Sequence, residues 1–275
     1  MGKKSMKPLA MTFDKNAAEY RRYRPGYPSA ISEEVVNILG LHEGCRILEI
    51  GCGAGQATDL FADLRPTQVC IDPGEKLLVE CRASHGSLPG YSFVCSTFEE
   101  YDDEPGTFDL IYAATCFHWL KPVLRFKKAA RLLSKQGGLA VFTDRHTKKK
   151  EGFFTEVQII YKEVAPELIS STPSVLQDEG TVEENPLSLL HQSEYDREIR
   201  YTSDEYVGLL KTFSGHIALG EGKLSELCNG IRALIERRYG GIIIKTLTTS
   251  LAIYGNAQQL RRTDADKPRH SLKAS

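Results

Sequence analysis

Between residues 45 and 144, short apolar runs alternate with stretches of helical periodicity, and this alternation restricts the fold more than any other feature of the chain. The apolar runs predict buried strands, which we place at 46–50, 68–72, 91–95, 108–114 and 138–143. The stretches between them predict helices near 57–64, 75–83 and 123–133. Strands and helices in this order form right-handed βαβ units. We therefore expect an α/β fold with a Rossmann-like parallel sheet over residues 45–144.

The segment before this core predicts two helices, over 15–24 and 29–40, with two prolines between them that prevent one continuous helix. We assign residues 13–44 to an N-terminal helical lid. Residues 1–12 are polar and lack the apolar stretch of a signal peptide, so we expect a disordered leader there.

After residue 144 the alternation ends. Residues 145–240 predict a mostly helical cap, with a long polar loop or cap segment over 166–193 and a strand over 195–201. Within this cap we expect helices near 153–164, 203–213 and 221–238. The β-branched run in 241–256 predicts an antiparallel closing strand of the sheet. The polar tail, 257–275, is predicted to be disordered.

Composition narrows the range of partners. The 275 residues carry a formal net charge of −1, which gives no general attraction to nucleic acid or to an anionic membrane. No apolar run is long enough to span a bilayer. The seven cysteines include no Cys-x-x-Cys pair, which argues against a zinc site or a disulfide framework. We expect a cytoplasmic protein without a bound metal, and the oligomeric state stays open.

The segment Glu49-Ile-Gly-Cys-Gly-Ala-Gly55 follows the first predicted strand. Glycines at such a turn let the backbone approach a ligand closely, and the start of the next predicted helix would offer free N–H groups. A dinucleotide fingerprint would need glycine where Gln56 stands, and the Gly-Lys-Ser/Thr of a phosphate-binding loop is absent. Asp72, at the end of the second predicted strand, could accept hydrogen bonds from both hydroxyls of a ribose.

At these residues the chain resembles the class I methyltransferases that depend on S-adenosylmethionine (SAM). Within them it is similar to the bacterial type 11 group, which includes relatives of quinone-biosynthesis and trans-aconitate methyltransferases. The resemblance runs from about Phe13 to Tyr254. It is carried mainly by Ile47–Gln56, Ile71-Asp72 and Phe108–Ile111, with support from Tyr23–Pro28 and Phe117–Trp119.

The resemblance implies SAM as cofactor, S-adenosylhomocysteine as its product, and a role for each matching residue. Glu49 and the loop Gly51-Cys52-Gly53 would meet the methionine part, and Asp72 the ribose. Thr97 and Phe98 would flank the adenine, and Ala113 would lie beside the sulfonium with its neighbour Ala114. Many relatives carry an acidic residue near Ser96 and Thr97 that binds the adenine amine. Here Ser96, Thr97 or a backbone group would have to replace it.

Several residues outside the cofactor motifs are candidates for binding or catalysis. His118, just after the fourth predicted strand, could act as a general base or hold an acidic substrate, or it could be a residue packed beneath the cap. Its neighbour Trp119 would form a substrate wall or part of the core. Tyr23, Arg24 and Tyr27 form an aromatic and basic cluster that is either a lid over the ligands or a solvated helix face. The basic run 145–150 could attract a carboxylate substrate, but we interpret it as solvated surface.

The predicted function is transfer of a methyl group from SAM to an O, N or C nucleophile of a small molecule, possibly a carboxylate. An alternative is a methyltransferase for nucleic acid or protein. The net charge and the lack of an amino-methylase motif near 113–116 disfavour it. A second alternative is a SAM-binding regulator without catalysis, because its cofactor motifs would look the same.

Overall fold

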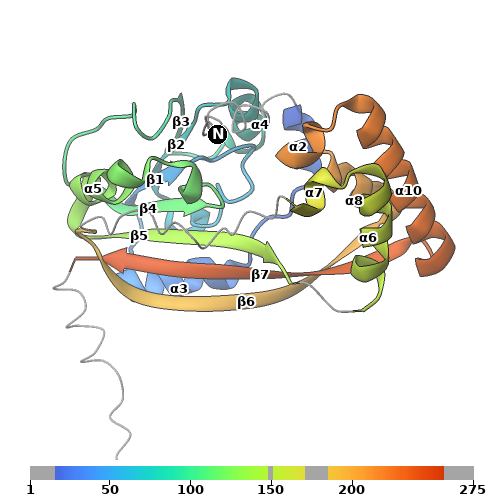
Figure 1. The fold of residues 1–275 in the computed structure, drawn as a ribbon. Coiled ribbons are helices and arrows are strands. Elements are labelled where there is room, and N and C mark those ends of the chain that lie inside the picture. The colour runs from blue at the N-terminus through green and yellow to red at the C-terminus, as the bar shows by residue number, and fades with distance from the viewer. Residues whose placement is uncertain (1–15, 148–150, 171–184, 257–275) are drawn as a thin grey trace, which may run out of the picture.

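The computed structural model describes residues 16–147, 151–170 and 185–256, so the predicted leader and tail lie outside the described residues. Its centre is a seven-stranded sheet in the order β3-β2-β1-β4-β5-β7-β6 (Figure 1). The first five strands run parallel, and β7 pairs antiparallel with both β5 and β6. The bounds are Arg46–Ile50 (β1), Thr67–Asp72 (β2), Tyr91–Cys95 (β3), Phe108–Ala114 (β4), Leu133–His146 (β5), Ser188–Thr202 (β6) and Ile242–Gly255 (β7). The predicted Rossmann-like sheet with an antiparallel closing strand is confirmed.

Helices cover both faces of this sheet. On one face, α3 (Ser29–Leu39) buries Ile31 and Val35 completely against inward residues of β1, β4, β5 and β7. On the other, α5 (Pro122–Leu132) buries Ala129 and Leu132. The helix α4 (Glu75–His85) packs on β2 and β3. Since α3 is part of the core, only the segment before it is available as a lid.

The predicted helix over 57–64 is wrong. Residues 57–61 form turns, and a short 3₁₀ helix, η2, spans Ala62–Leu64. The apolar residues of this segment are nevertheless buried, Ala57 and Phe61 almost completely. Two carbonyls are occupied by buried side chains, because Tyr112 donates to Ala57 and Gln68 donates to Thr58. These bonds replace part of an α-helical ladder, which sequence periodicity cannot reveal.

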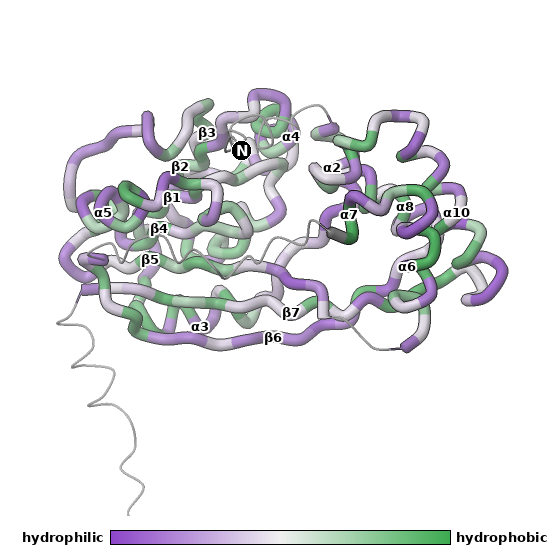
Figure 2. Tube along the Cα trace, in the orientation of Figure 1, coloured by the Kyte–Doolittle hydropathy of each residue, from purple (hydrophilic) through white to green (hydrophobic). Residues whose placement is uncertain are grey.

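Strand β6 is longer than predicted and occupies part of the range that we assigned to a loop. Its side chains are mostly polar, as Figure 2 shows along the edge of the sheet. A polar edge strand resists pairing with other chains, and it also lacks the apolar alternation by which strands are recognised. The range 145–240 is therefore not only a helical cap, because it contributes one strand to the sheet. Strand β5 likewise extends beyond its predicted range, 138–143, at both ends.

A second, helical unit lies at the end of the sheet toward which the β4 and β5 arrows point in Figure 1. Its helices pack around a shared core that includes Phe153, Tyr206, Leu227 and Ile231. In the described part of the chain, no helix combines the length and the apolar character needed to cross a bilayer. The helices of this second unit are α2 (Ala17–Tyr23), α6 (Phe153–Val164), α7 (Glu167–Ser170), α8 (Ser203–Leu210), α9 (Ser214–Ile217) and α10 (Glu221–Tyr239).

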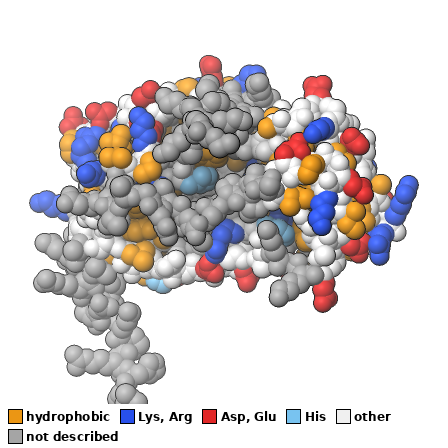
Figure 3. Space-filling model, viewed as in Figure 1, with side chains coloured by type: hydrophobic (Ala, Val, Ile, Leu, Met, Phe, Trp, Pro, Cys, Tyr) orange, Lys and Arg blue, Asp and Glu red, His pale blue; other side chains and the backbone are white. Residues whose placement is uncertain are grey.

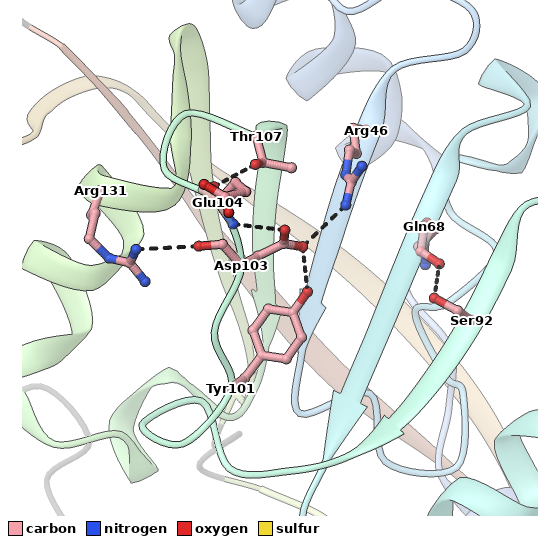
Figure 4. Close-up of polar contacts among 8 residues, drawn as sticks. All are labelled: Arg46, Gln68, Ser92, Tyr101, Asp103, Glu104, Thr107 and Arg131. Carbon is pink, nitrogen blue, oxygen red and sulfur yellow. Dashed lines mark hydrogen bonds and ion pairs between the residues drawn. The ribbon is translucent and has the colours of Figure 1, made fainter.

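The other end of the sheet, where β1 and β4 begin, is fixed by a polar network around Asp103 (Figure 4). The hydroxyl of Tyr101 and the guanidinium of Arg46 both donate to the Asp103 carboxylate, at 2.9 and 3.1 Å. Arg131 on α5 donates to the Asp103 carbonyl at 3.3 Å. The connection between β3 and β4 is thereby attached to the beginning of β1 and to α5.

Candidate cofactor and substrate site

The glycine turn after β1 is a sharp loop in which three glycines have positive φ: 64° at Gly51, 56° at Gly53 and 91° at Gly55. Only glycine adopts such angles readily. A Cβ atom on Gly51 would lie 2.8 Å from the sulfur of Cys116, and one on Gly55 would lie 2.5 Å from the ring of His85. Both positions therefore require glycine for conformation and for space. Cys52 between them is buried, and its N–H donates to the Ile71 carbonyl at 3.1 Å.

Asp72, the last residue of β2, faces this loop. The backbone N–H groups of Gly53 and Gly74 donate to its two carboxylate oxygens, at 2.9 and 2.7 Å. These bonds fix the orientation of the carboxylate. Because a carboxylate has about four lone-pair sites, an oriented Asp72 can also accept bonds from a ligand. The N–H of Ser96 donates to the Asp72 carbonyl at 3.1 Å, so the segment after β3 lies beside it.

Glu49 on β1 is almost completely buried. Its Oε2 accepts hydrogen bonds from Thr58 at 2.7 Å and from Gln68 at 3.4 Å, whereas Oε1 is buried and has no partner among the described residues. Burial raises the pKa of this carboxyl group to about 8. An unpaired buried acceptor beside a glycine turn is a place where a ligand's ammonium group could bind. The donors and acceptors here fit the methionine and ribose parts of SAM.

Thr97 and Phe98 follow β3 near Asp72. The Thr97 hydroxyl donates to the Glu100 carboxylate at 2.9 Å and accepts from the Glu100 N–H at 3.2 Å, which makes a local turn. Phe98 is buried in the core, with the Lys128 ammonium 5.5 Å from its ring centre. Ala113 is fully buried at the end of β4. Contacts of these residues with adenine and sulfonium remain predictions.

A cavity of about 190 Å³ lies between the helical unit and the ends of β4 and β5. It shares a wall with the glycine turn, because Gln56 lines it and donates to the Tyr20 carbonyl at 3.2 Å. The Tyr20 ring would lie 3.8 Å from a Cβ atom on Gly53. The lining residues are Tyr20, Arg24, Pro25, Tyr27, Gln56, Thr115, Asp144, His146, Tyr201, Leu209, Phe213, Lys245 and Leu247.

Two of the predicted lid residues, Arg24 and Tyr27, line this cavity, but Tyr23 does not. The ring of Tyr23 packs on α8, where a Cβ atom on Gly208 would lie 2.5 Å from it. His118 and Trp119 are also not in the lining; they lie in the short 3₁₀ helix η3 (Phe117–Trp119) with their ring centres 4.9 Å apart. Burial, with a contribution from Arg125, lowers the pKa of His118. Catalysis by His118 is thus unsupported by the cavity geometry.

Thr115 was not predicted, although it lines the cavity. Its φ is 56°, a rare conformation for a β-branched residue, and such angles concentrate at functional sites. Its hydroxyl lies 2.8 Å from that of Tyr27 and accepts the N–H of Asp144 at 3.3 Å. It therefore connects the lid segment to the end of β5. No sequence pattern reveals a positive φ at threonine.

Lys245 on β7 was also missed, and here the sequence did contain a signal. The inward positions of β7 are Ile243, Lys245, Leu247, Thr249, Leu251 and Ile253, so a lysine stands in phase with buried apolar residues. Burial, together with the nearby Arg24, lowers the pKa of Lys245 to about 8. A charged residue at an inward strand position indicates a functional role.

A larger cavity of about 510 Å³ lies where β4 and β5 begin, with Gly106, Arg131 and Leu187 among its lining residues. In open α/β sheets, ligands bind outside the carboxyl ends of the strands. The smaller cavity meets this condition and the larger one does not. We therefore take the smaller cavity and the adjoining glycine turn as the candidate site.

Comparisons with known proteins concern the domain that carries this candidate site. A family profile described as "Methyltransferase domain" matches residues 48–140, the stretch that contains the glycine turn and Asp72. An uncharacterised methyltransferase of Mycobacterium tuberculosis is 27% identical over 137 residues, which cover 50% of this chain and 54% of the relative. Trans-aconitate 2-methyltransferase of Variovorax paradoxus is 31% identical over 109 residues, covering 39% and 40%. The chain spans about half the length of the curated relatives it matches.

A protein of known structure shares the fold of this chain. A candidate type II methyltransferase from Anaeromyxobacter dehalogenans superposes with a TM-score of 0.60 at 22% identity, over 85% of this chain and 98% of the other. At this identity the similarity demonstrates a shared fold. Residues 48–140 thus match a methyltransferase-domain profile, and the chain shares the Rossmann-like fold of a methyltransferase of known structure.

Proposed function

We propose that the chain is a SAM-dependent methyltransferase whose acceptor is a small molecule. The observation that carries the proposal is the cavity beside the glycine turn: Gln56, which follows the turn, lines the cavity and donates to the carbonyl of Tyr20 on the cavity wall. Drug-sized ligands occupy pockets of about 300–1,000 Å³. A cavity of about 190 Å³ accommodates a smaller acceptor.

The cofactor would be held by residues on β1, its glycine turn and the end of β2. Asp72 would accept the ribose hydroxyls, Glu49 would receive the methionine ammonium, and Gly51 and Gly53 would allow close approach of the backbone. When bound, SAM supplies a methyl group on a sulfonium, and transfer to a nucleophile leaves the carbon–sulfur electron pair on S-adenosylhomocysteine. The protein's own task is to orient the acceptor and to exclude water.

Exclusion of water is a task for the segment around α2. Tyr20, Arg24 and Tyr27 line the cavity from the side of the helical unit, and α2 contacts both α4 and α8. We assign these three residues to the lid. Tyr23, the last residue of α2, holds this helix in place, because its ring packs on α8.

A macromolecular acceptor fits less well. Over the described residues of the face in Figure 3, acidic and basic side chains are mixed around the rim. A nucleic-acid-binding surface would be expected to present a basic stripe or patch. The size of the cavity is a second argument against a protein or nucleic-acid acceptor.

The test is a pair of measurements on the purified protein. Calorimetry should detect binding of S-adenosylhomocysteine in preference to NAD, and SAM should be converted to S-adenosylhomocysteine when small-molecule acceptors are supplied. Binding without turnover over a broad acceptor panel would favour the alternative of a SAM-binding regulator without catalysis. Preference for NAD would overturn the proposal.

A further inference from the structure

Lys245 places a positive charge inside the cavity without a partner. The residue is 8% exposed, and its ammonium has neither a hydrogen bond nor an ion pair with the described residues. It lies 5.5 Å from the ring centre of Phe213, on the wall formed by α8 and the loop after it. A buried charge without a counterion is costly, so its retention indicates that something else neutralises it.

Arg24 adds a second positive charge to the same cavity. Its guanidinium lies over Phe213, at 4.3 Å from the ring centre, and over Tyr20, at 5.0 Å. It donates to the hydroxyl and the carbonyl of Thr212, at 2.9 and 3.2 Å, and it has no acidic partner among the described residues. Neutral acceptors and aromatic rings thus hold Arg24 in place without cancelling its charge.

Asp144 is the one acidic side chain among the described lining residues, and its charge favours the ammonium form of Lys245, but its carboxylate is already engaged by other side chains. The two carboxylate oxygens of Asp144 accept hydrogen bonds from Thr249 and from Arg197, the latter at 2.5 Å. Asp144 and Arg197 therefore form an ion pair of their own. Counted over the residues that the structure describes, Arg24 and Lys245 therefore leave an excess of positive charge in the cavity.

Tyr201 supplies a further donor. Its side chain lines the cavity and is 5% exposed, and its hydroxyl has no hydrogen-bond partner among the described residues. Burial raises the pKa of Tyr201 to about 12, so the hydroxyl keeps its proton and can donate. A buried polar group without a partner is rare and requires an explanation.

We propose that the methyl acceptor carries a carboxylate, which binds in the cavity between the Lys245 ammonium, the Arg24 guanidinium and the Tyr201 hydroxyl. This inference rests on the proposed function, because it names the class of acceptor for the same site. A carboxylate supplies the negative charge and the acceptor atoms that all three groups lack. The relative named for trans-aconitate provides a tricarboxylate as the first probe.

The experiment measures carboxylate binding to the protein saturated with S-adenosylhomocysteine. Calorimetry should detect trans-aconitate or a smaller dicarboxylate such as succinate, and should not detect dimethyl succinate, which has a similar skeleton without charge. Lys245→Met should weaken binding at least 10-fold, and Tyr201→Phe about 3- to 10-fold. The matched control is Lys162→Met on α6, an exposed lysine outside the cavity lining, which should bind like the wild type.

The inference would be overturned by binding of inorganic phosphate but of no carboxylate in a panel of mono-, di- and tricarboxylates. Equal affinity of Lys245→Met and wild type, or equal binding of the diester, would also overturn it. Failure of all carboxylates to bind, with S-adenosylhomocysteine bound, overturns it too and leaves the methyltransferase proposal intact. Failure to bind S-adenosylhomocysteine would instead refute the proposed function. Thermal denaturation of each variant separates loss of binding from loss of folding.

Discussion

At the scale of single residues, Asp72 has two tasks, because it holds the glycine turn and is proposed to bind the ribose. We expect Asp72→Ala to weaken S-adenosylhomocysteine binding about 10- to 100-fold, since charge-assisted hydrogen bonds contribute about 1.5–3 kcal/mol each. Unfolding free energy should fall by about 1–2 kcal/mol, because two backbone N–H groups lose their acceptor. Calorimetry and chemical denaturation measure the two effects, with the exposed Asp63→Ala as control. Unchanged affinity in folded Asp72→Ala would remove this residue from the cofactor site.

Glu49 predicts a dependence of stability on pH in the absence of ligand. Its pKa of about 8 in the folded chain lies above the ordinary value of 4.5, so the folded state holds a proton that the unfolded state has released. The contribution is therefore fully present below about pH 4.5 and is lost as the pH rises toward 8. Between pH 5 and 8, the free energy of unfolding of the wild type should fall by up to about 3 kcal/mol more than that of Glu49→Gln, as measured by urea denaturation. Parallel pH profiles for the two proteins would contradict this assignment.

Lys245 predicts the opposite dependence on pH, because this buried charge, proposed to bind the acceptor, lowers the stability of the folded chain. Its pKa is lowered from 10.5 to about 8, because the folded state disfavours its charged form. Lys245 therefore leaves the free energy of unfolding undiminished only above about pH 10.5, and it lowers that free energy as the pH falls through 8. Lys245→Met should raise the free energy of unfolding at pH 7 by about 1–3 kcal/mol. The gain should disappear above pH 10.5. A destabilised methionine variant at pH 7 would show that the buried ammonium is compensated within the protein.

Individual residues differ in how far the sequence reveals them. The position of Asp72 beside the glycine turn was predictable, because an acid at the end of the second strand after such a turn forms a pattern that the sequence alone displays. Lys245 was predictable in principle from its phase in β7. Thr115 and the pairing of Asp144 with Arg197 were not, because a backbone angle and a contact between distant strands leave no local pattern.

At the scale of secondary structure, regular periodicity was a sound guide and tertiary hydrogen bonds were the main source of error. The apolar spacing of 57–64 correctly identified which residues are buried. It could not show that side chains from β2 and β4 occupy the carbonyls of that segment. Similarly, β6 was only partly found, because a polar edge strand carries little hydrophobic alternation.

The element with a testable motion is α2 with the segment up to Tyr27. Because Tyr20 and Gln56 connect it to the glycine turn, a ligand bound there should stabilise the segment. Hydrogen exchange of residues 17–27 should therefore slow when S-adenosylhomocysteine is added, while exchange in α10 stays unchanged. Equal exchange with and without bound ligand would show that α2 is a fixed structural helix.

At the scale of the whole molecule, two units meet at one site. The sheet supplies the glycine turn and Asp72, and the helical unit closes the cavity with Tyr20, Arg24 and Phe213. The sheet was predictable from the strand–helix alternation. The identity of the cavity wall was not, because it depends on how residues near 20, 210 and 245 come together in space.

The central claim is that this chain transfers a methyl group from SAM to a small molecule. The most direct measurement supplies SAM with a radiolabelled methyl group to the purified protein, together with an extract of the source organism divided by ultrafiltration into small molecules and macromolecules. We predict label in the small-molecule fraction, with an equal amount of S-adenosylhomocysteine formed and with loss of both in Asp72→Ala. Label in the macromolecular fraction, or no transfer to either fraction by protein that binds S-adenosylhomocysteine, would contradict the claim.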